Sequence, residues 1–496
     1  MTLKIGIVGC GLQAATIAGY LGAFGDDYEV CAVMDLNCEN ARGKLALKEV
    51  RVAKDCVFCS DLDTFIANSS GLSGIIIGTY CTFHTPVACA LEKLHIPIYV
   101  EKPVAVNREQ LMELHRVFAD STTSVMVSLP MRFAPLTQKA KEIIDSGALG
   151  KLGQVMGFEE TSGEVYFTTW YRDYEKTGGM FMQKAVHDID YLLYLVNSPV
   201  KRICAMKNKV CYAGDKPYDF TCRECPDTAT CPKGPLARFD EWGEVKSFAE
   251  GMKAATEAPT YGGPARKRFC PYSKDIAIED VTACIAELEN GVQFIHTQNF
   301  IVSGGAGRRG ARLVGDRGVL EIDFNNSKLR LHAMPQNSIT EYSVSSGALS
   351  HYGGDRKLVK EFIELMKNTA IEIDSYFVGQ KQSHFNHTSP GFSVTNRDLS
   401  EYLGKMGRLV DAGALLRAIE GNGSPMLVPN VYVAPGSVEE LDLSRYFPNG
   451  EQLTYTCTIS DTSVASATIN GTILKVKGEN TGSTTATIKT LCKFKL

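Results

Sequence analysis

The 496-residue sequence has no excess of positive charge and no apolar run long enough to cross a bilayer. Its formal net charge is -4, with 52 Lys and Arg against 56 Asp and Glu. The basic residues are mixed among acidic ones and form no stripe or polybasic patch. We therefore expect neither nucleic acid nor a membrane as a partner, and we expect a small molecule instead.

The first residues, MTLKIGIVGC, lack the long hydrophobic stretch and small-residue cleavage site of a secretory signal. The 16 cysteines are scattered along the chain and form no short disulfide framework, which favours a reducing compartment. These features predict a cytoplasmic protein. A hydrophobic content of 44% over this length is enough for two or three separate cores.

The N-terminal segment alternates short β-branched runs with helical stretches, as a parallel sheet covered by helices requires. The pattern predicts an α/β Rossmann domain over residues 1–128. Its expected strands are Lys4–Val8, Glu29–Met34, Gly74–Ile77, Ile98–Val100 and Ser124–Val127.

Residues 129–428 are expected to form an α+β domain with a large open, mainly antiparallel sheet and a cysteine-rich insert at 211–272. Ala283–Glu289 and Val292–Asn299 flank Asn290-Gly291, the strongest short hairpin signal. We expect this domain to bind the substrate. Its open sheet exposes surface for self-association, so we also expect a homodimer or homotetramer.

The C-terminal segment, residues 429–496, is rich in Ser, Thr and Gly and contains alternating strands such as Gln452–Ile459 and Ile473–Val476. It predicts a small all-β sandwich. Its sequence resembles bacterial immunoglobulin-like modules.

The first chemical motif is VGCGLQAA, which follows the first strand and opens a helix with Leu12 and Gln13. Gly9 makes the tight turn, Gly11 lets the backbone approach a pyrophosphate, and Ala14 keeps helix and strand close. Asp35 ends the second strand, where its carboxylate can accept both hydroxyls of the adenine ribose and would repel a 2'-phosphate. This arrangement predicts NAD as the cofactor, in preference to NADP.

The second motif, Glu101-Lys102-Pro103, follows a strand at the carboxyl edge of the predicted parallel sheet, where ligands bind. This motif, together with Gly11, Asp35, Thr79 and His84 in that order along the chain, resembles the glucose-fructose oxidoreductase and inositol dehydrogenase (Gfo/Idh/MocA) family. The likeness runs from Ile5 to about Asn422 and includes GVLEID at 318–323 and HYGGD at 351–355. It implies that NAD contacts come from Gly9, Gly11, Leu12, Gln13, Asp35, Thr79, His84, Glu101 and Lys102.

The third motif, GGMFMQKAVHDIDYLLYL, predicts a helix whose polar residues gather on and beside one face. The family's equivalent helix carries a histidine that faces the nicotinamide, matched here by His187. An aspartate usually stands four residues earlier, where this sequence has Gln183. The candidate substrate contacts on this helix are Gln183, Lys184, Asp188 and Tyr191, and the loops add Arg132, Trp170, Tyr171 and Arg172.

The resemblance implies hydride transfer between NAD and a carbinol of a sugar, glycoside or cyclitol, in which a base removes the hydroxyl proton. Lys102 and His187 are the candidate catalytic residues, and which of them accepts the proton stays open. Two alternatives remain. One is an NAD-dependent glycosidase that oxidises the sugar transiently and eliminates the aglycone, and the other is a non-catalytic NAD or sugar sensor.

A fourth group of residues has the spacing of metal ligands. TCRECPDTATCPKG contains CxxC followed by a third cysteine, and RFCPYS adds a fourth. We expect a structural four-thiolate zinc site, or alternatively an iron-sulfur cluster, held by Cys222, Cys225, Cys231 and Cys270.

Overall fold

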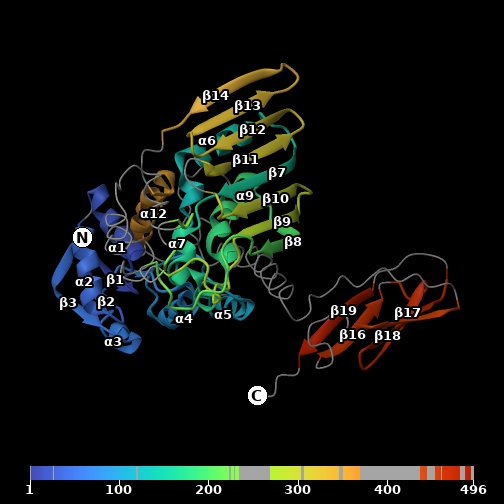
Figure 1. Cartoon of the computed structure of the whole chain (residues 1–496), viewed down its shortest axis with the longest axis horizontal. Coiled ribbons are helices and arrows are strands. Elements are labelled where there is room, and N and C mark those ends of the chain that lie inside the picture. Colours follow the sequence, from blue (N-terminus) through green and yellow to red (C-terminus); the bar gives the residue numbers. More distant parts are fainter. Residues whose placement is uncertain are drawn as a thin grey trace. The chain divides into compact units, whose positions relative to one another are not determined.

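The computed structural model describes residues 2–233, 269–368 and 436–492, except positions 26, 119–120, 223–224, 228–229, 303–305, 346–349, 444–452, 460 and 481–485. The chain divides into two compact units, Met1–Asp411 and Ala412–Leu496. Figure 1 labels their helices and strands.

A six-stranded parallel sheet forms the N-terminal part of the first unit. The spatial order is β3-β2-β1-β4-β5-β6, with the strands β1 (Leu3–Val8), β2 (Tyr28–Met34), β3 (Val52–Cys59), β4 (Gly74–Ile77), β5 (Ile98–Val100) and β6 (Val125–Val127). The helices of this region are α1 (Leu12–Tyr20), α2 (Cys38–Leu47), α3 (Leu62–Ala67), α4 (Cys81–Leu91) and α5 (Arg108–Phe118). The predicted Rossmann fold is confirmed, and the order reverses between β1 and β4, where such sheets bind ligands.

A second sheet of eight strands follows in the chain. Its order is β14-β13-β12-β11-β7-β10-β9-β8, with β7 (Leu152–Glu160), β8 (Val200–Asn208), β9 (Val281–Leu288), β10 (Gln293–Asn299), β11 (Arg308–Gly315), β12 (Gly318–Asp323), β13 (Lys328–Ala333) and β14 (Ser338–Ser343). Only the pair β7 and β10 is parallel among these neighbours, so the sheet is mainly antiparallel, as predicted. The expected hairpin joins β9 to β10, and Gly291 adopts φ +86° in its turn.

Helices α6 (Pro135–Asp145) and α9 (Val186–Val196) contact this second sheet. The close approach of α9 to β7 depends on Gly157, because a Cβ at that position would lie 2.3 Å from a methyl carbon of Leu192. The helix therefore holds its side chains directly against the middle of the sheet.

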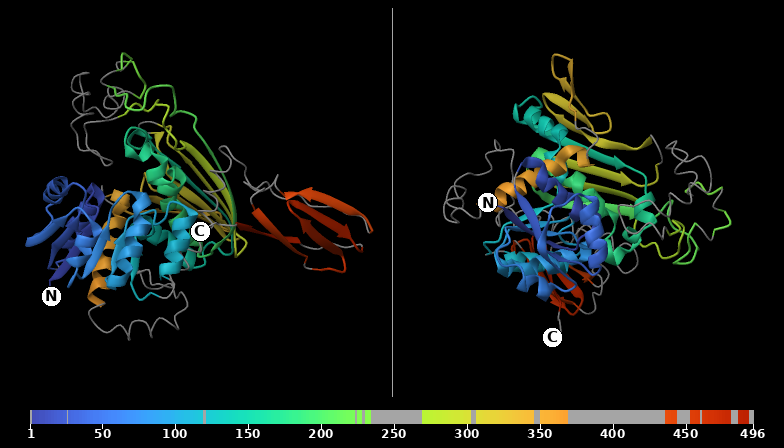
Figure 2. Two further views of the ribbon diagram at one scale, coloured as in Figure 1. Left: turned by 90° about the horizontal axis from the view of Figure 1, so that it is seen from below. Right: turned by 90° about the vertical axis from the view of Figure 1, so that its left-hand side faces the viewer.

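Helix α12 (Gly354–Asn368) returns to the first sheet after the second sheet is complete. Leu358, Phe362 and Met366 are buried in one core with Ile5 and Tyr99, and the rings of Tyr99 and Phe362 lie 5.5 Å apart. Both views in Figure 2 show this orange helix beside the blue N-terminal region. The core of the domain with the parallel sheet is thus built from its own strands and helices and from α12, which follows the second sheet in the chain.

The described part of the second unit contains two antiparallel sheets. Strands β15 (Val438–Asp442), β18 (Ile473–Gly478) and β17 (Ala465–Asn470) form one, and β16 (Leu453–Ile459) and β19 (Ala486–Cys492) form the other. A small core of Leu443, Ala465, Leu474 and Val476 packs against Cys457 of β16. The predicted small all-β region is therefore present, whereas its likeness to immunoglobulin-like modules stays a prediction.

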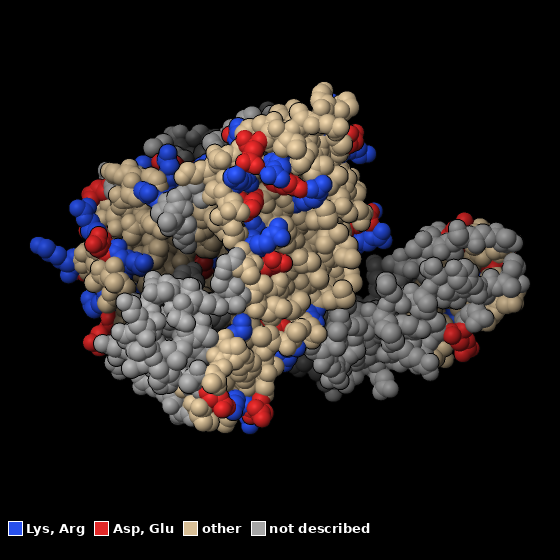
Figure 3. Space-filling view, turned by 45° about the horizontal axis from the view of Figure 1, so that its top comes forward, with Lys and Arg blue, Asp and Glu red and all other residues tan. Residues whose placement is uncertain are grey.

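The surface carries charges of both signs. On the face shown in Figure 3, acidic and basic side chains are interspersed over the described part of the first unit. Among the described helices, none combines the length and apolar character that a membrane span requires.

Candidate active site

The glycine turn after β1 is shaped for close approach. Gly9 adopts φ +78°, and a Cβ there would lie 2.6 Å from the backbone nitrogen of Thr79, which follows β4. Gly11 occupies the N-cap position of α1 and has no side chain with which to cap the helix. Leu12 and Gln13 begin α1, so the partial positive charge of this helix end faces the turn. These residues fit a dinucleotide pyrophosphate.

Asp35 lies beside the same turn. One carboxylate oxygen accepts a hydrogen bond from the backbone N–H of Cys10 at 2.9 Å, and the other accepts one from Asn37 at 2.8 Å. The backbone thus holds this carboxylate next to the glycine turn. The position matches the one predicted for a group that binds the adenine ribose.

Two of the predicted cofactor residues instead hold the backbone. His84 is buried, and its ring nitrogens lie 2.8 Å from the carbonyl oxygen of Pro103 and 3.1 Å from that of Thr79. Burial lowers the pKa of His84 to about 4, so the ring is neutral. Glu101 is also buried and hydrogen-bonds Ser128, while burial raises the pKa of its carboxyl group. Both residues fix the segment that presents Lys102.

A cavity of about 150 Å³ lies where Lys102 meets the segment before α9. Its wall is formed by seven residues, Lys102, Tyr166, Tyr171, Gln183, Lys184, His187 and His351. All of them were predicted as site residues except Tyr166 and His351. Lys102 Nζ donates a hydrogen bond to the carbonyl oxygen of Gln183 at 2.8 Å. Within the described residues, Gln183 Oε1 and His187 Nδ1 are buried without a hydrogen-bond partner. Buried polar atoms are normally paired, so this wall suits an oxygen-rich ligand.

The helix of the third motif begins with a π-helical turn, Phe181–Ala185, which continues into α9. Such turns are rare and often occur at functional sites. Gln183 and His187 reach the cavity, whereas Asp188 and Tyr191 lie in the protein interior against the second sheet. The predicted substrate contacts by these last two residues are therefore corrected to interior contacts.

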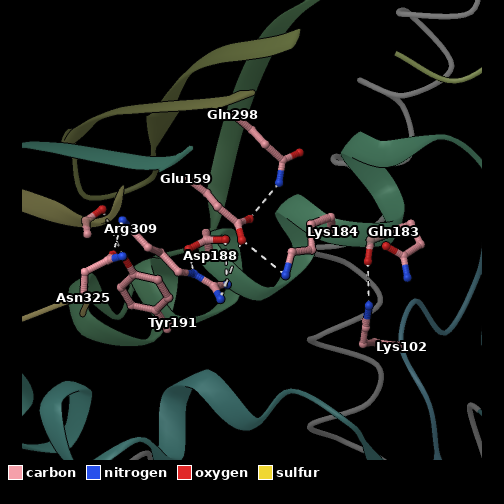
Figure 4. A network of polar contacts seen from close by, with 10 residues as sticks. Lys102, Glu159, Gln183, Lys184, Asp188, Tyr191, Gln298, Arg309 and Asn325 are labelled. Carbon is pink, nitrogen blue, oxygen red and sulfur yellow. Dashed lines mark hydrogen bonds and ion pairs between the residues drawn. The ribbon is translucent and has the colours of Figure 1, made fainter. Parts of the chain in front are cut away.

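Those interior contacts form a buried polar network (Figure 4). Arg309 of β11 binds Asp188 through two hydrogen bonds of 2.8 Å, and one of its nitrogens lies 3.7 Å from Glu159 of β7. Glu159 also pairs with Lys184 at 3.2 Å and accepts a hydrogen bond from Gln298 at 2.9 Å. Two cations thus balance two carboxylates, and the network anchors Lys184 at the cavity wall.

The charges in this network shift its pKa values in opposite directions. Burial opposes ionisation of Glu159, but Arg309 and Lys184 outweigh it and hold the pKa of Glu159 well below its usual range. Burial raises the pKa of Asp188 to about 7 against the effect of Arg309. Burial lowers the pKa of Lys184, yet Glu159 more than compensates and raises it overall, so Lys184 stays charged.

Lys102 forms no ion pair with a carboxylate among the described residues. Burial lowers its pKa to about 8, and the neighbouring charge of Lys184 acts in the same direction. Lys102 is therefore mainly an ammonium group at pH 7, close to the pH at which it loses its proton.

Two predicted substrate residues are placed elsewhere. Arg132 pairs with Asp190, with Nε donating at 2.9 Å, and does not line the cavity. Arg172 is buried, donates to the carbonyl oxygen of Cys270 at 3.2 Å and pairs with Asp275 at 2.7 Å. Both arginines are satisfied by protein groups, so we correct their assignment to structural contacts.

Trp170 lies behind the cavity wall. Its ring stacks on Tyr171, with centroids 4.0 Å apart, and contacts Tyr80 at 4.6 Å. Tyr171 itself lines the cavity, as predicted. The cavity wall therefore presents the rings of Tyr171, on which Trp170 stacks, and of Tyr166.

The four cysteines proposed as metal ligands do not form a metal site in the described structure. Cys222, Cys225, Cys231 and Cys270 are all described and none forms a disulfide, but no group of three or more His, Cys, Asp or Glu among the described residues has an arrangement suited to a metal ion. Cys225 and Cys231 are near enough to Cys270 to raise the pKa of its thiol, although burial has the larger effect. The zinc and iron-sulfur predictions are thus not supported by the described residues.

Comparison with known families agrees with this geometry. Residues 3–129 match the model described as an oxidoreductase family with an NAD-binding Rossmann fold, and residues 137–231 match the GFO/IDH/MocA C-terminal domain. These two stretches carry both domains of the GFO/IDH/MocA oxidoreductase family, so the family resemblance of the sequence is confirmed there. The chain is thus an NAD-binding oxidoreductase.

Relatives of this oxidoreductase have different activities. Inositol 2-dehydrogenase of Salmonella paratyphi B is 25% identical over 289 residues, covering 56% of this chain and 80% of that protein. The 2,7-anhydro-N-acetylneuraminate hydratase of Escherichia coli is 21% identical over 252 residues, covering 50% of this chain and 63% of that protein. A levoglucosan dehydrogenase structure with NADH and levoglucosan has a TM-score of 0.58 at 14% identity, over 84% of this chain and 98% of that one. The last likeness shows a shared fold.

Proposed function

We propose that this oxidoreductase transfers hydride between NAD and a carbinol carbon of a sugar, glycoside or cyclitol. The observation that carries the proposal is the cavity wall, which combines Lys102 with the unpaired polar atoms of Gln183 and His187. Lys102 follows β5 at the carboxyl edge of the parallel sheet, the edge at which the glycine turn also lies. The relatives named for inositol, and the structure that holds levoglucosan, support this substrate class.

In the proposed reaction, the site residues of this chain would have separate roles. The turn at Gly9 and Gly11 would bind the pyrophosphate, and Asp35 the adenine ribose. Bound NAD would supply the hydride acceptor, C4 of its nicotinamide. Lys102, mainly charged at pH 7 and hydrogen-bonded to Gln183, suits a donor to the reacting hydroxyl oxygen. Tyr171 would offer its ring to the apolar face of the substrate.

The test is an assay of the purified protein with NAD and a panel of sugars, cyclitols and glycosides. Formation of NADH together with a ketone product identified by mass spectrometry is the expected result. A panel in which every compound is recovered unchanged, although NAD binds, would count against the proposal.

A second candidate is an NAD-dependent glycosidase or lyase that oxidises a sugar carbon only transiently. It is favoured by the relative named as a hydratase and by Gln183 at the position of the family's usual aspartate. The same assay separates the two functions. Release of an aglycone without net NADH would identify the second one.

NAD is expected to bind at least roughly tenfold more tightly than NADP, because the Asp35 carboxylate would accept ribose hydroxyls and repel a 2'-phosphate. Isothermal titration calorimetry measures both affinities. Asp35→Ser should narrow the difference, whereas Glu39→Gln, which removes a nearby exposed carboxylate on α2, should leave it unchanged. Equal affinities in the wild-type protein would contradict the assignment.

The kcat/KM for carbinol oxidation is expected to fall as the pH rises through about 8, where Lys102 loses its proton. The sign follows from its role, because a neutral amine no longer stabilises negative charge on the hydroxyl oxygen. A pH–rate profile measures this decrease, and Lys102→Met should abolish it. An increase in rate over the same pH range would instead identify neutral Lys102 as the base.

A further inference from the structure

A histidine–aspartate pair reaches the cavity from a segment remote in sequence from the other wall residues. His351 precedes α12 and lines the cavity, and its Nδ1 lies 2.9 Å from Oδ2 of Asp355 in the first turn of that helix. Asp355 is only 1% exposed. A buried carboxylate at Nδ1 fixes the tautomer that leaves Nε2 as the acceptor.

The backbone of this segment is held in an unusual conformation. His351 and Tyr352 have φ values of +44° and +54°, and Gly353 continues the left-handed stretch with φ +86°. Gly354 packs so closely on the segment before α6 that a Cβ there would lie 2.0 Å from the carbonyl oxygen of Pro130. Non-glycine residues rarely adopt positive φ, and such residues concentrate at active sites where the surroundings enforce them.

His187 and His351 lie side by side, with ring centroids 4.8 Å apart, but their surroundings differ. Burial and then the charges of Lys102, His351, Lys184 and Arg309 hold the pKa of His187 well below its usual value. Burial also lowers the pKa of His351, but Asp355 opposes that effect through its charge and its hydrogen bond. Of these two rings, only His351 has a carboxylate in place to stabilise an imidazolium.

We propose that His351 is the catalytic residue that accepts the hydroxyl proton, that Asp355 is its positioning residue, and that His187 orients the substrate as a neutral imidazole. The inference rests on the proposed function. In the step, the carbinol C–H bond would break and its hydrogen would pass with the electron pair, as hydride, to bound NAD, while the O–H bond would break and its proton would pass to Nε2 of His351. A carbonyl group would form, and Asp355 would stabilise the imidazolium of His351.

The pH dependence of this step involves the titratable and charged groups that face His351 among the described residues. Asp355 of α12, Lys184 of the turn before α9 and Arg309 of β11 act on its charge. The same cavity is also lined by Lys102 after β5, His187 of α9 and Tyr166 of α7 (Glu164–Phe167). His351 must be neutral to accept a proton, so kcat/KM falls as the pH drops through the His351 pKa. Removing the Asp355 charge lowers that pKa, so this acidic limb moves to lower pH.

The kinetic test uses Asp355→Asn and His351→Asn, the latter because asparagine tolerates positive φ. Each variant is expected to lose about 10²–10⁴-fold in kcat, with KM and NAD affinity within roughly threefold of wild type. Asp355→Asn should also move the acidic limb downward, which a merely structural role would not do. The matched control is Glu321→Gln, which removes the carboxylate beside His332 on the second sheet, away from the cavity.

A second measurement needs neither a substrate nor a variant that turns over. Nuclear magnetic resonance of ¹⁵N-histidine in the full-length protein, with His351→Asn and His187→Asn used for assignment, reports the tautomer and the titration of each ring. We expect His351 to carry its proton on Nδ1 and to become charged at higher pH than His187. The opposite order of protonation, or an Nε2–H tautomer of His351, would overturn the proposal.

The kinetic and nuclear magnetic resonance measurements distinguish failure of this inference from failure of the proposed function. NADH formation that persists unchanged in His351→Asn would overturn the role of His351 and leave the dehydrogenase intact. If no carbinol is oxidised by the wild-type protein, the proposed function fails, and the role of His351 as proton acceptor in that reaction falls with it.

Discussion

Lys102→Met is expected to lower kcat by about 10²–10³-fold, the usual effect of removing a group that stabilises developing negative charge. Methionine keeps much of the side-chain volume, so the segment after β5 should retain its position. NAD affinity should stay within roughly threefold of wild type, because Lys102 lies at the cavity and we expect the glycine turn to provide most of the pyrophosphate contacts. Steady-state kinetics and calorimetry measure the two effects.

Lys141→Met is the matched control for this variant. Lys141 is also largely buried, with its side chain 8% exposed and paired with Asp145, but it lies on α6 and does not line the cavity. Its replacement should leave kcat unchanged. If Lys102→Met turned over a good substrate at the wild-type rate, the catalytic centre would have to lie elsewhere.

Arg309→Met is expected to destabilise the first unit by about 3–5 kcal/mol, because removing one partner of a buried ion pair leaves a charge without compensation. Arg309 is the bidentate partner of Asp188, and only Lys184 would remain to balance Asp188 and Glu159. Guanidinium denaturation followed by tryptophan fluorescence measures the free energy of unfolding. Trp170 lies in the described part of the first unit, where it stacks on Tyr171, so its fluorescence reports on that unit.

Arg312→Met on the same strand provides the comparison. Arg312 also pairs with a glutamate, Glu321, but its side chain is 45% exposed. Solvent screens such surface pairs, which typically contribute only about 0–1 kcal/mol. Similar losses of stability in the two variants would mean that the buried network contributes little.

The sequence predicted most of the first sheet because its strands β4, β5 and β6 are short apolar runs that are buried throughout, and β1 is apolar apart from Lys4. The edge strand β3 was missed, since Lys54 and Asp55 interrupt its apolar pattern. The hairpin of β9 and β10 was found from its turn, because Asn-Gly specifies a backbone conformation locally.

The parts of the site that depend on local sequence motifs could also be predicted from the sequence. The glycine turn, Asp35 and Lys102 each follow a predicted strand, so a parallel sheet must bring them to one edge. His187 and Gln183 line the cavity together with Lys102. Asp188 and Tyr191 lie on the side of the helix that meets the second sheet, and helical spacing alone cannot tell which side that is.

The residues missed by sequence reasoning come from distant strands and loops. Glu159 and Arg309 belong to neighbouring strands of the second sheet and meet Asp188 only once that sheet forms. His351 stands in the family-like stretch HYGGD, and that stretch with its two glycines was the available sequence signal. His351 approaches His187 because the chain returns to the first sheet at α12, and no local sequence pattern predicts that return.

That return has a consequence for how the protein is made. Residues 1–128 leave the ribosome without Leu358, Phe362 and Met366, which share a core with Ile5 and Tyr99 in the finished structure. Until more than 200 further residues have been synthesised, the apolar side of the nascent cofactor domain against which α12 packs stays open. Chaperones or the growing second sheet must protect it during this interval. Because His351 immediately precedes α12, the last segment to close that core is also the one that brings a histidine to the cavity.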